Sequence, residues 1–129
     1  MEHRLSFASV KLINPNIAEV IVDAGVNISI EMVEEYEALL GQLFHDEFAL
    51  IVNQINSYDY SFEAKLLIGS HEKLKAIAVI FYNKNAEKIA SEIANLRRVD
   101  DFNVRLYPGL ELGRQECMTW LEEELKQAS

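Results

Sequence analysis

Two segments of this 129-residue chain are apolar at almost every position, and they restrict its fold more than any other feature. Residues 48–52 read Phe-Ala-Leu-Ile-Val, and residues 76–82 read Ala-Ile-Ala-Val-Ile-Phe-Tyr. A strand with one solvent-exposed face alternates apolar and polar side chains, whereas a strand buried on both faces is apolar throughout. Both segments therefore predict central strands of a mostly parallel sheet whose two faces are covered.

Other elements are predicted on either side of these strands. Residues 4–13 and 17–23 are predicted strands, and the turn signal Asn14-Pro15-Asn16 between them favours an antiparallel hairpin. Ser29 is the expected N-cap of a first helix, whose apolar residues recur at helical spacing from Val33 onward. The remaining predicted elements are strands at 48–53, 76–82 and 102–107 and helices at about 60–69, from Asn83 or Asn85, and at about 111–126.

The order of these elements defines the predicted fold class. Two strands are followed by alternating helices and strands, and the chain ends in a fourth helix. Parallel strands joined by right-handed helical crossovers satisfy this order. We therefore expect one α/β domain over residues 1–129, with five strands in a mostly parallel sheet.

Composition restricts the cellular compartments and the classes of partner that are expected for this chain. The net charge is −9, so we expect no binding to nucleic acid, whose phosphates such a surface repels. No apolar run approaches membrane-spanning length, so we expect no integral membrane association. Cys117 is the only cysteine, which excludes an internal disulfide and suits a reducing compartment. Residues 1–6 contain no apolar signal core, so the predicted location is the cytoplasm.

Patterns typical of enzymes are absent from the sequence. It has neither the glycine pattern of a phosphate-binding loop nor a serine flanked by glycines as in a nucleophile elbow. His3, His45 and His71 lie in separate segments, so we predict no metal site and no cofactor. We expect a non-enzymatic protein, and the one weak alternative is an acid pair formed by Asp23 and Asp59.

The candidate site is the polar segment 56–61, which follows the first fully apolar strand. Ligands and partners of open α/β sheets meet the carboxyl ends of the strands. A helix N-terminus follows directly, where free backbone N–H groups stabilise a phosphate. A structural interpretation is also open, in which Asp59 or Ser61 caps the helix and the tyrosines pack across the turn. The candidate contact residues are Asn56, Ser57, Tyr58, Asp59, Tyr60 and Ser61.

The layout resembles the STAS domain, the fold of SpoIIAA-type anti-sigma-factor antagonists. The resemblance rests on the leading hairpin, the strands at 48–52 and 76–82, the short loop to Ser61 and the closing amphipathic helix. It is closest to small bacterial SpoIIAA-like proteins of unassigned role. It implies sequential strand order in a right-handed superhelix of strand–helix units, and a regulatory, protein-binding role.

The resemblance also implies a role for one residue of the candidate site. In the antagonists, a serine that follows an aspartate in this loop is the phosphorylation switch, and Ser61 lies nearest to that position. Here Tyr60 separates Ser61 from Asp59, Phe62 stands in place of a small residue, and no glycine follows. Because it lies nearest to the switch position, Ser61 is the candidate phosphoacceptor that the resemblance implies.

A sequential sheet carries its helices mainly on one face, so the doubly apolar strands raise the question of what covers the other. The candidates are another part of the chain, a second subunit or an apolar ligand. We expect a homodimer ahead of a ligand. The predicted function is an interaction module that contacts a protein partner through loop 56–61. The alternative is a binder of a small, lipid-like molecule on the sheet face.

Overall fold

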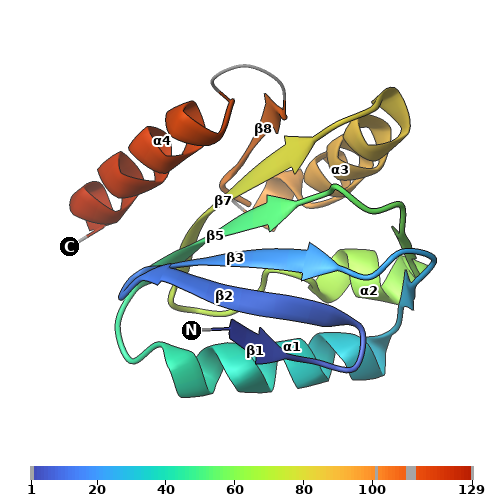
Figure 1. Ribbon diagram of the computed structural model, residues 1–129, viewed down its shortest axis with the longest axis horizontal. Coiled ribbons are helices and arrows are strands. Elements are labelled where there is room, and N and C mark those ends of the chain that lie inside the picture. Colours follow the sequence, from blue (N-terminus) through green and yellow to red (C-terminus); the bar gives the residue numbers. More distant parts are fainter. Residues whose placement is uncertain (1, 101, 110–112, 129) are drawn as a thin grey trace.

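The computed structural model describes residues 2–100, 102–109 and 113–128. A mixed sheet with the order β1-β2-β3-β5-β7-β8 forms the centre of the molecule (Figure 1). Its strands are β1 (Glu2–Arg4), β2 (Ala8–Asn14), β3 (Ile17–Val22), β5 (Phe48–Asn53), β7 (Leu74–Phe81) and β8 (Val104–Pro108). The helices are α1 (Ile30–Leu43), α2 (Phe62–Leu67), α3 (Lys84–Leu96) and α4 (Gly113–Ala128), with a 3₁₀ turn η1 (Arg98–Asp100).

The sheet confirms the predicted α/β class, the sequential order and the hairpin, and it corrects the strand count. Strands β1, β2 and β3 pair antiparallel, while the pairs β3–β5, β5–β7 and β7–β8 are parallel. Five strands were expected and six are present, because the predicted first strand is two strands. The break falls at residues 5–7, where the Leu5 N–H bonds the Ala8 carbonyl and Ser6 donates to Glu35 of α1.

Helix α4 covers the second face of the sheet, so another part of the chain provides the cover (Figure 1). Ile51, Ala78 and Ile80 pack on this side against Cys117 and Leu121, which have no exposed surface. Alanines on the strands let the helix approach the sheet closely. The face that suggested a second subunit or a ligand is therefore occupied within the chain, between β7 and α4.

The opposite face carries α1, α2 and α3 on a larger core. Ser29 caps α1 as predicted, with its hydroxyl accepting from the Met32 N–H at 3.3 Å. Val33, Tyr36 and Leu40 face the sheet. Ile77 and Val79 of β7 point to the α3 side, as the alternation along that strand predicts. The predicted start of the last helix at residue 111 lies outside the described residues, and the described helix begins at Gly113.

An ion pair near the start of α4 ties that helix to the sheet. Arg114 donates from both Nη atoms to the Glu19 carboxylate of β3, at 2.8 and 2.9 Å. Asn53 of β5 donates to the same carboxylate at 2.9 Å. These contacts, led by the bonds from Arg114, hold the pKa of Glu19 below its usual value of 4.5.

Replacing Leu121 by alanine should lower the free energy of unfolding by about 2–5 kcal/mol, because it leaves a cavity between α4 and the sheet. Thr119→Ala is the matched control on the exposed side of the same helix, with an expected change below about 0.5 kcal/mol. Urea unfolding of both variants measures the difference. Equal effects would show that α4 does not cover the core of the sheet.

The Glu19–Arg114 pair predicts a specific pH dependence. The pKa of Glu19 is lower in the folded than in the unfolded chain, so its contribution to stability is complete above pH 4.5 and is lost as the pH falls below that value. Arg114→Gln should be less stable than the wild type at neutral pH. The difference in unfolding free energy should narrow at acid pH in urea titrations between pH 7 and pH 3. A constant difference would contradict the assignment.

Candidate functional site

The predicted contact segment is a structured connection held against the strand end beside it. Residues 59–60 form a short strand, β6 (Asp59–Tyr60), which pairs in parallel with β4 (Asn27–Ile28) in a separate two-stranded sheet. The Gly25 N–H bonds the Ser57 carbonyl at 2.8 Å, and the Asn56 side chain bonds the Val22 carbonyl at 3.0 Å. The segment therefore presents a fixed conformation at the carboxyl edge of the main sheet.

This pairing turns the two tyrosines of the segment inward. Tyr58 is 9% exposed and belongs to the core beneath α1. Tyr60 is half-buried, and its ring centroid lies 5.7 Å from that of Tyr58. The tyrosines therefore pack as in the structural interpretation of this segment and do not form an exposed aromatic surface. The aromatic rings stabilise the segment from inside, and its exposed residues are Ser57 and Asp59, next to the exposed Ile55 that precedes it.

Ser61 takes the structural role that the sequence left open. Its hydroxyl accepts from the Ala64 N–H at 3.2 Å and caps α2. Asp59 is exposed, accepts a hydrogen bond from the Tyr60 N–H and has Lys65 at 4.0 Å. The use of Ser61 as a phosphoacceptor stays a prediction, and its hydroxyl would first have to leave the cap.

Four polar side chains gather in the interior behind this segment: Tyr36 of α1, Gln54, Tyr58 and Tyr60. Gln54 is 5% exposed, and its amide group interacts with the Tyr58 hydroxyl, which also interacts with that of Tyr60. Burial raises the pKa of all three tyrosines, so they are protonated at neutral pH. The cluster is an uncharged set of hydroxyl and amide groups.

A small cavity lies between this cluster and α3, and we call it the inner cavity. Its volume is about 50 Å³. Aliphatic side chains from the sheet and α3 form most of its wall, with Gln54 among the polar members. The lining residues are Tyr36, Val52, Gln54, Tyr60, Ile68, Gly69, Ile77, Val79, Ala90, Ile93, Phe102 and Val104.

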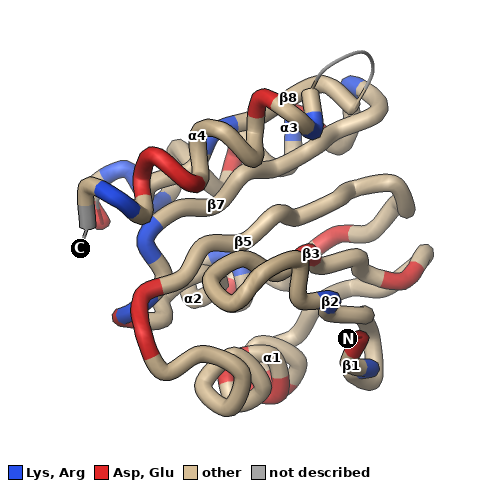
Figure 2. The backbone as a smooth tube through the Cα atoms, turned by 60° about the vertical axis from the view of Figure 1, so that its left-hand side comes forward, with Lys and Arg blue, Asp and Glu red and all other residues tan. Residues whose placement is uncertain are grey.

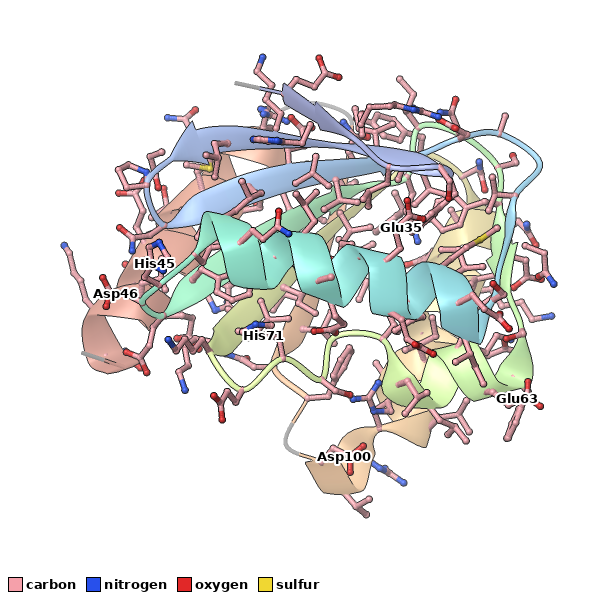
Figure 3. The ribbon with its side chains drawn as sticks, turned by 90° about the horizontal axis from the view of Figure 1, so that it is seen from below. Glu35, His45, Asp46, Glu63, His71 and Asp100 are labelled. Carbon is pink, nitrogen blue, oxygen red and sulfur yellow. The ribbon has the colours of Figure 1, made fainter. Side chains whose placement is uncertain are left out.

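An open pocket of about 440 Å³, the outer pocket, adjoins the inner cavity. Gly69, Ile77 and Phe102 line both spaces and form the wall between them. Figure 3 labels His71 and Asp100, two polar residues of the outer pocket. The other lining residues are Leu66, Ser70, Leu74, Lys75, Ala76, Arg97 and Asn103.

Arg97 closes one side of the outer pocket. The guanidinium donates to the carbonyls of Lys65 and Ile68, to the Ser70 hydroxyl and to Asp100. It also lies 4.6 Å from the centroid of the Phe102 ring. A cation at the C-terminal end of a helix such as α3 commonly lies in solvent and complements the helix dipole. Arg97 is instead 4% exposed and joins α3 to the end of α2.

Large apolar side chains are exposed on α2 and at the end of α3. Phe62 and Leu66 lie four residues apart on α2, so they share one helix face. Leu96 at the end of α3 is 43% exposed, because Ala90 and Ile93 take the buried positions of that helix. Hydrogen bonds from Arg97 hold the two helices together. We call this region the α2–α3 surface, formed by Phe62, Leu66, Leu67, Leu96 and Val99.

The remaining chemical candidates do not form a reactive site. Asp23 is bound to Arg4, which lowers the pKa of that carboxyl, whereas a proton-sharing acid pair would raise one. Asp59 has separate partners, so the two carboxylates do not form the proposed acid pair. Burial raises the pKa of the Cys117 thiol to about 11, so it is not a nucleophile at neutral pH. Among the described residues, no cluster of histidine, cysteine or acidic side chains could hold a metal.

The chain matches no protein-family model, no curated protein and no solved structure. The helices within residues 2–100, 102–109 and 113–128 include none with the length and apolarity needed to span a bilayer.

The sequence predicted that segment 56–61 lies at the carboxyl edge of the sheet, where the structure has it, but it did not predict the inner polar cluster or the two cavities. Neither Gln54 nor Tyr36 is among the candidate contact residues that the sequence indicated. One signal was present: Gln54 directly follows six residues of a buried strand, Phe48 to Asn53, where the chain is still in the interior. Gly69 is the second signal, because its φ of 75° bends the chain past Phe102.

Replacing Gln54 by methionine should lower the free energy of unfolding by about 1 kcal/mol or more, because it takes the amide partner from the buried Tyr58 hydroxyl. Methionine has a similar shape but offers no comparable hydrogen bond. Gln115→Met is the matched control on the exposed part of α4, with an expected change below about 0.5 kcal/mol. Urea unfolding of both variants measures the difference. An unchanged or higher stability of Gln54→Met would show that the amide has no partner.

Proposed function

We propose that this protein is a non-enzymatic interaction module, similar to STAS-domain regulators, that binds a protein partner through segment 56–61 and the adjoining α2–α3 surface. The exposed apolar surface of α2 and α3 carries this proposal. Phe62 is 61% exposed and Val99 93% exposed. Clusters of exposed large apolar side chains mark contact sites more often than single ones do.

Two further features support a contact at this position. Segment 56–61 and α2 lie next to each other, and hydrogen bonds to residues 22–28 fix the segment, so little ordering would be needed on binding. The sequential sheet with α2 after its central strand is also the layout on which the STAS resemblance rests. Partner contact near Ser61 agrees with the switch position of that family.

The charges around the α2–α3 surface favour a basic partner. Asp59, Glu63, Glu92 and Asp100 are exposed beside it, and the chain has a net charge of −9. Arg98, between Leu96 and Val99 in the sequence, is an exposed basic residue at the same place. Figure 3 shows Glu63 on α2 and Asp100 beyond the end of α3. Lys65 is only 18% exposed and is held by Asp59 and Glu92. An apolar patch with an acidic border fits a partner with an apolar patch and a basic border.

The acidic residues beside the α2–α3 surface also disfavour a homodimer through that surface. A symmetric dimer through this surface would bring the same acidic groups of two copies together, which costs free energy. Acidic segments are widely distributed over the molecule, including α4 (Figure 2). We therefore propose a different protein as the partner at this surface and place any homodimer contact elsewhere.

Phosphorylation of Ser61 would act on this contact through charge. A phosphate at the N-cap would gain from the N-terminal dipole of α2, but it would also add negative charge between Asp59 and Glu63. A basic partner would bind the phosphorylated form more tightly. The proposed switch therefore strengthens the complex and does not release it.

The double variant Phe62→Asp with Leu66→Asp tests the proposal. Qualitative capture from lysate of the source organism identifies the partner, and titration with the purified partner then gives the affinity. We expect a loss of at least about tenfold, because two central apolar contacts become charged. Binding should also weaken as salt concentration rises.

Gln115→Asp with Thr119→Asp is the matched control, since it places the same charges four residues apart on an exposed part of α4. It should bind the partner like the wild type. Circular dichroism verifies that both double variants remain folded. Equal affinity of the two variants would refute the α2–α3 surface as the contact.

A further inference from the structure

We propose that two copies of this chain pair through β8, edge to edge and antiparallel, so that their two sheets join into one. The sheet has two edge strands, β1 and β8. β1 has three residues, and Arg4 at its end is bound to Asp23. β8 has five residues and therefore offers the longer edge. This contact is separate from the α2–α3 surface and does not depend on it.

The backbone of β8 presents hydrogen-bonding groups on its outer side. On the inner side, the Asn103 carbonyl accepts from the Ile77 N–H of β7 at 2.9 Å. Successive residues of a strand turn their N–H and C=O groups to opposite sides, so Val104 and Leu106 direct theirs away from β7. In the described part of the chain, no strand lies beside these groups. Such an edge is a template for pairing with another chain.

The side chains of β8 differ between the two faces of the sheet. Val104 and Leu106 are half-buried on the α3 side, where they pack against the apolar residues of β7. Arg105 is exposed on the α4 side, and its guanidinium lies 5.0 Å from the centroid of the Trp120 ring. A second copy would therefore meet an apolar strip on one face and a charged groove on the other.

One antiparallel register suits both faces. A pair centred on Leu106 places the two copies of this residue opposite each other and Val104 opposite Pro108 of the second copy. Pro108 has no N–H, so one bond is lost at each end and roughly four backbone hydrogen bonds remain. A pair centred on Arg105 would instead bring two guanidinium groups face to face, which is unfavourable.

The register centred on Leu106 also brings opposite charges together. Arg105 would lie opposite Tyr107 of the second copy. Gly113 at the start of α4 lies close to Tyr107, and Glu116 is in the first turn of that helix. In the part of the chain that the structure describes, neither Arg105 nor Glu116 has an ion-pair partner. Pairing would give each Arg105 the Glu116 carboxylate of the other copy, and such self-complementary charge is what a two-fold contact requires.

The helices on both faces leave room for this pairing. Figure 1 shows β8 beyond β7 at the edge of the sheet, with α4 and α3 on opposite sides. Because α4 lies along β7, three strand spacings of about 4.8 Å each would separate the α4 helices of the two copies. Packed helices need only about 8–10 Å, so these two would not collide. A groove of about 440 Å³ between β8 and α4 gives the Arg105 side chain of the second copy space to enter.

Sedimentation equilibrium of the purified wild-type protein tests whether the copies pair. The contact is smaller than the roughly 1,600 Å² interface of stable complexes, so we expect a monomer–dimer equilibrium with a dissociation constant of about 1–100 µM. The variant Phe62→Asp with Leu66→Asp should dimerise like the wild type, which separates this contact from the α2–α3 surface. A protein that stays monomeric up to about 1 mM would overturn the proposal.

Charge reversal tests where the copies meet. Arg105→Glu and Glu116→Arg should each raise the dissociation constant at least about tenfold, because each places like charges opposite one another. The variant that carries both changes should pair within about threefold of the wild type, since the ion pairs form again with reversed sign. Glu122→Arg, exposed on α4 outside the groove, is the matched control and should pair like the wild type. Failure of the combined variant to restore pairing, with every protein folded by circular dichroism, would overturn the contact.

Cysteine cross-linking tests the register. Opposite residues of a hydrogen-bonded antiparallel pair have Cα atoms about 5.5 Å apart, so Leu106→Cys should form a disulfide-linked dimer under mild oxidation. Val104→Cys should not, because the two copies of that position would lie at least about 13 Å apart. The natural Cys117 is buried, with no exposed surface, and serves as the internal background. Cross-linking of neither variant, or of both equally, would overturn the register.

Discussion

The fold depends on a sheet that is apolar on both faces and must be covered on both. Phe48 and Leu50 point to the α1 side, and Ile51 and Ile80 to the α4 side. Burial of a large aliphatic side chain contributes about 1.5–3 kcal/mol relative to leaving it exposed, so a bare face over two strands would cost most of a small domain's stability. This requirement explains why a helix crosses to the far face after the last strand.

The helices that cover the two faces of the sheet differ, and this difference determines where the cavities and the exposed apolar side chains lie. On one face α4 lies along β7 in a single tight layer, tied to β3 by Arg114. On the other face three helices share the area, and α2 has only six residues. Because α2 is short, Gly69, Arg97 and Phe102 fill the space between it and α3 only in part. Both the cavities and the exposed apolar side chains arise from this incomplete helical layer.

Most of the fold was predictable from local sequence patterns. The runs at 48–52 and 76–82 located the central strands, and Ser29 and Asn83 marked helix starts because side-chain caps act over three residues. The β4–β6 pairing was missed, because it depends on contact between residues 27–28 and 59–60, which no local pattern encodes. The position of Trp120 in the core, where its ring contacts Arg105 and Tyr107, also depends on contacts between separate elements.

The candidate site was predictable at the level of position but not of chemistry. Strand polarity alone indicated the carboxyl edge of the sheet, where segment 56–61 lies. Whether Tyr58 points outward or inward was decided by its hydrogen-bonded neighbours 30 and more positions earlier in the chain. Arg97 of the outer pocket and Gln54 of the inner cavity come from separate elements, so only the tertiary structure places them at adjoining spaces.

The position of α4 in the chain has a consequence for biosynthesis. A ribosome delivers all six strands before this helix emerges, so the nascent sheet presents Ile17, Ile51 and Ile80 to the surrounding medium during that interval. Apolar surface exposed in this way is where chaperones bind and where aggregation begins. The interval between synthesis of β8 and synthesis of α4 therefore sets how long the growing polypeptide needs protection.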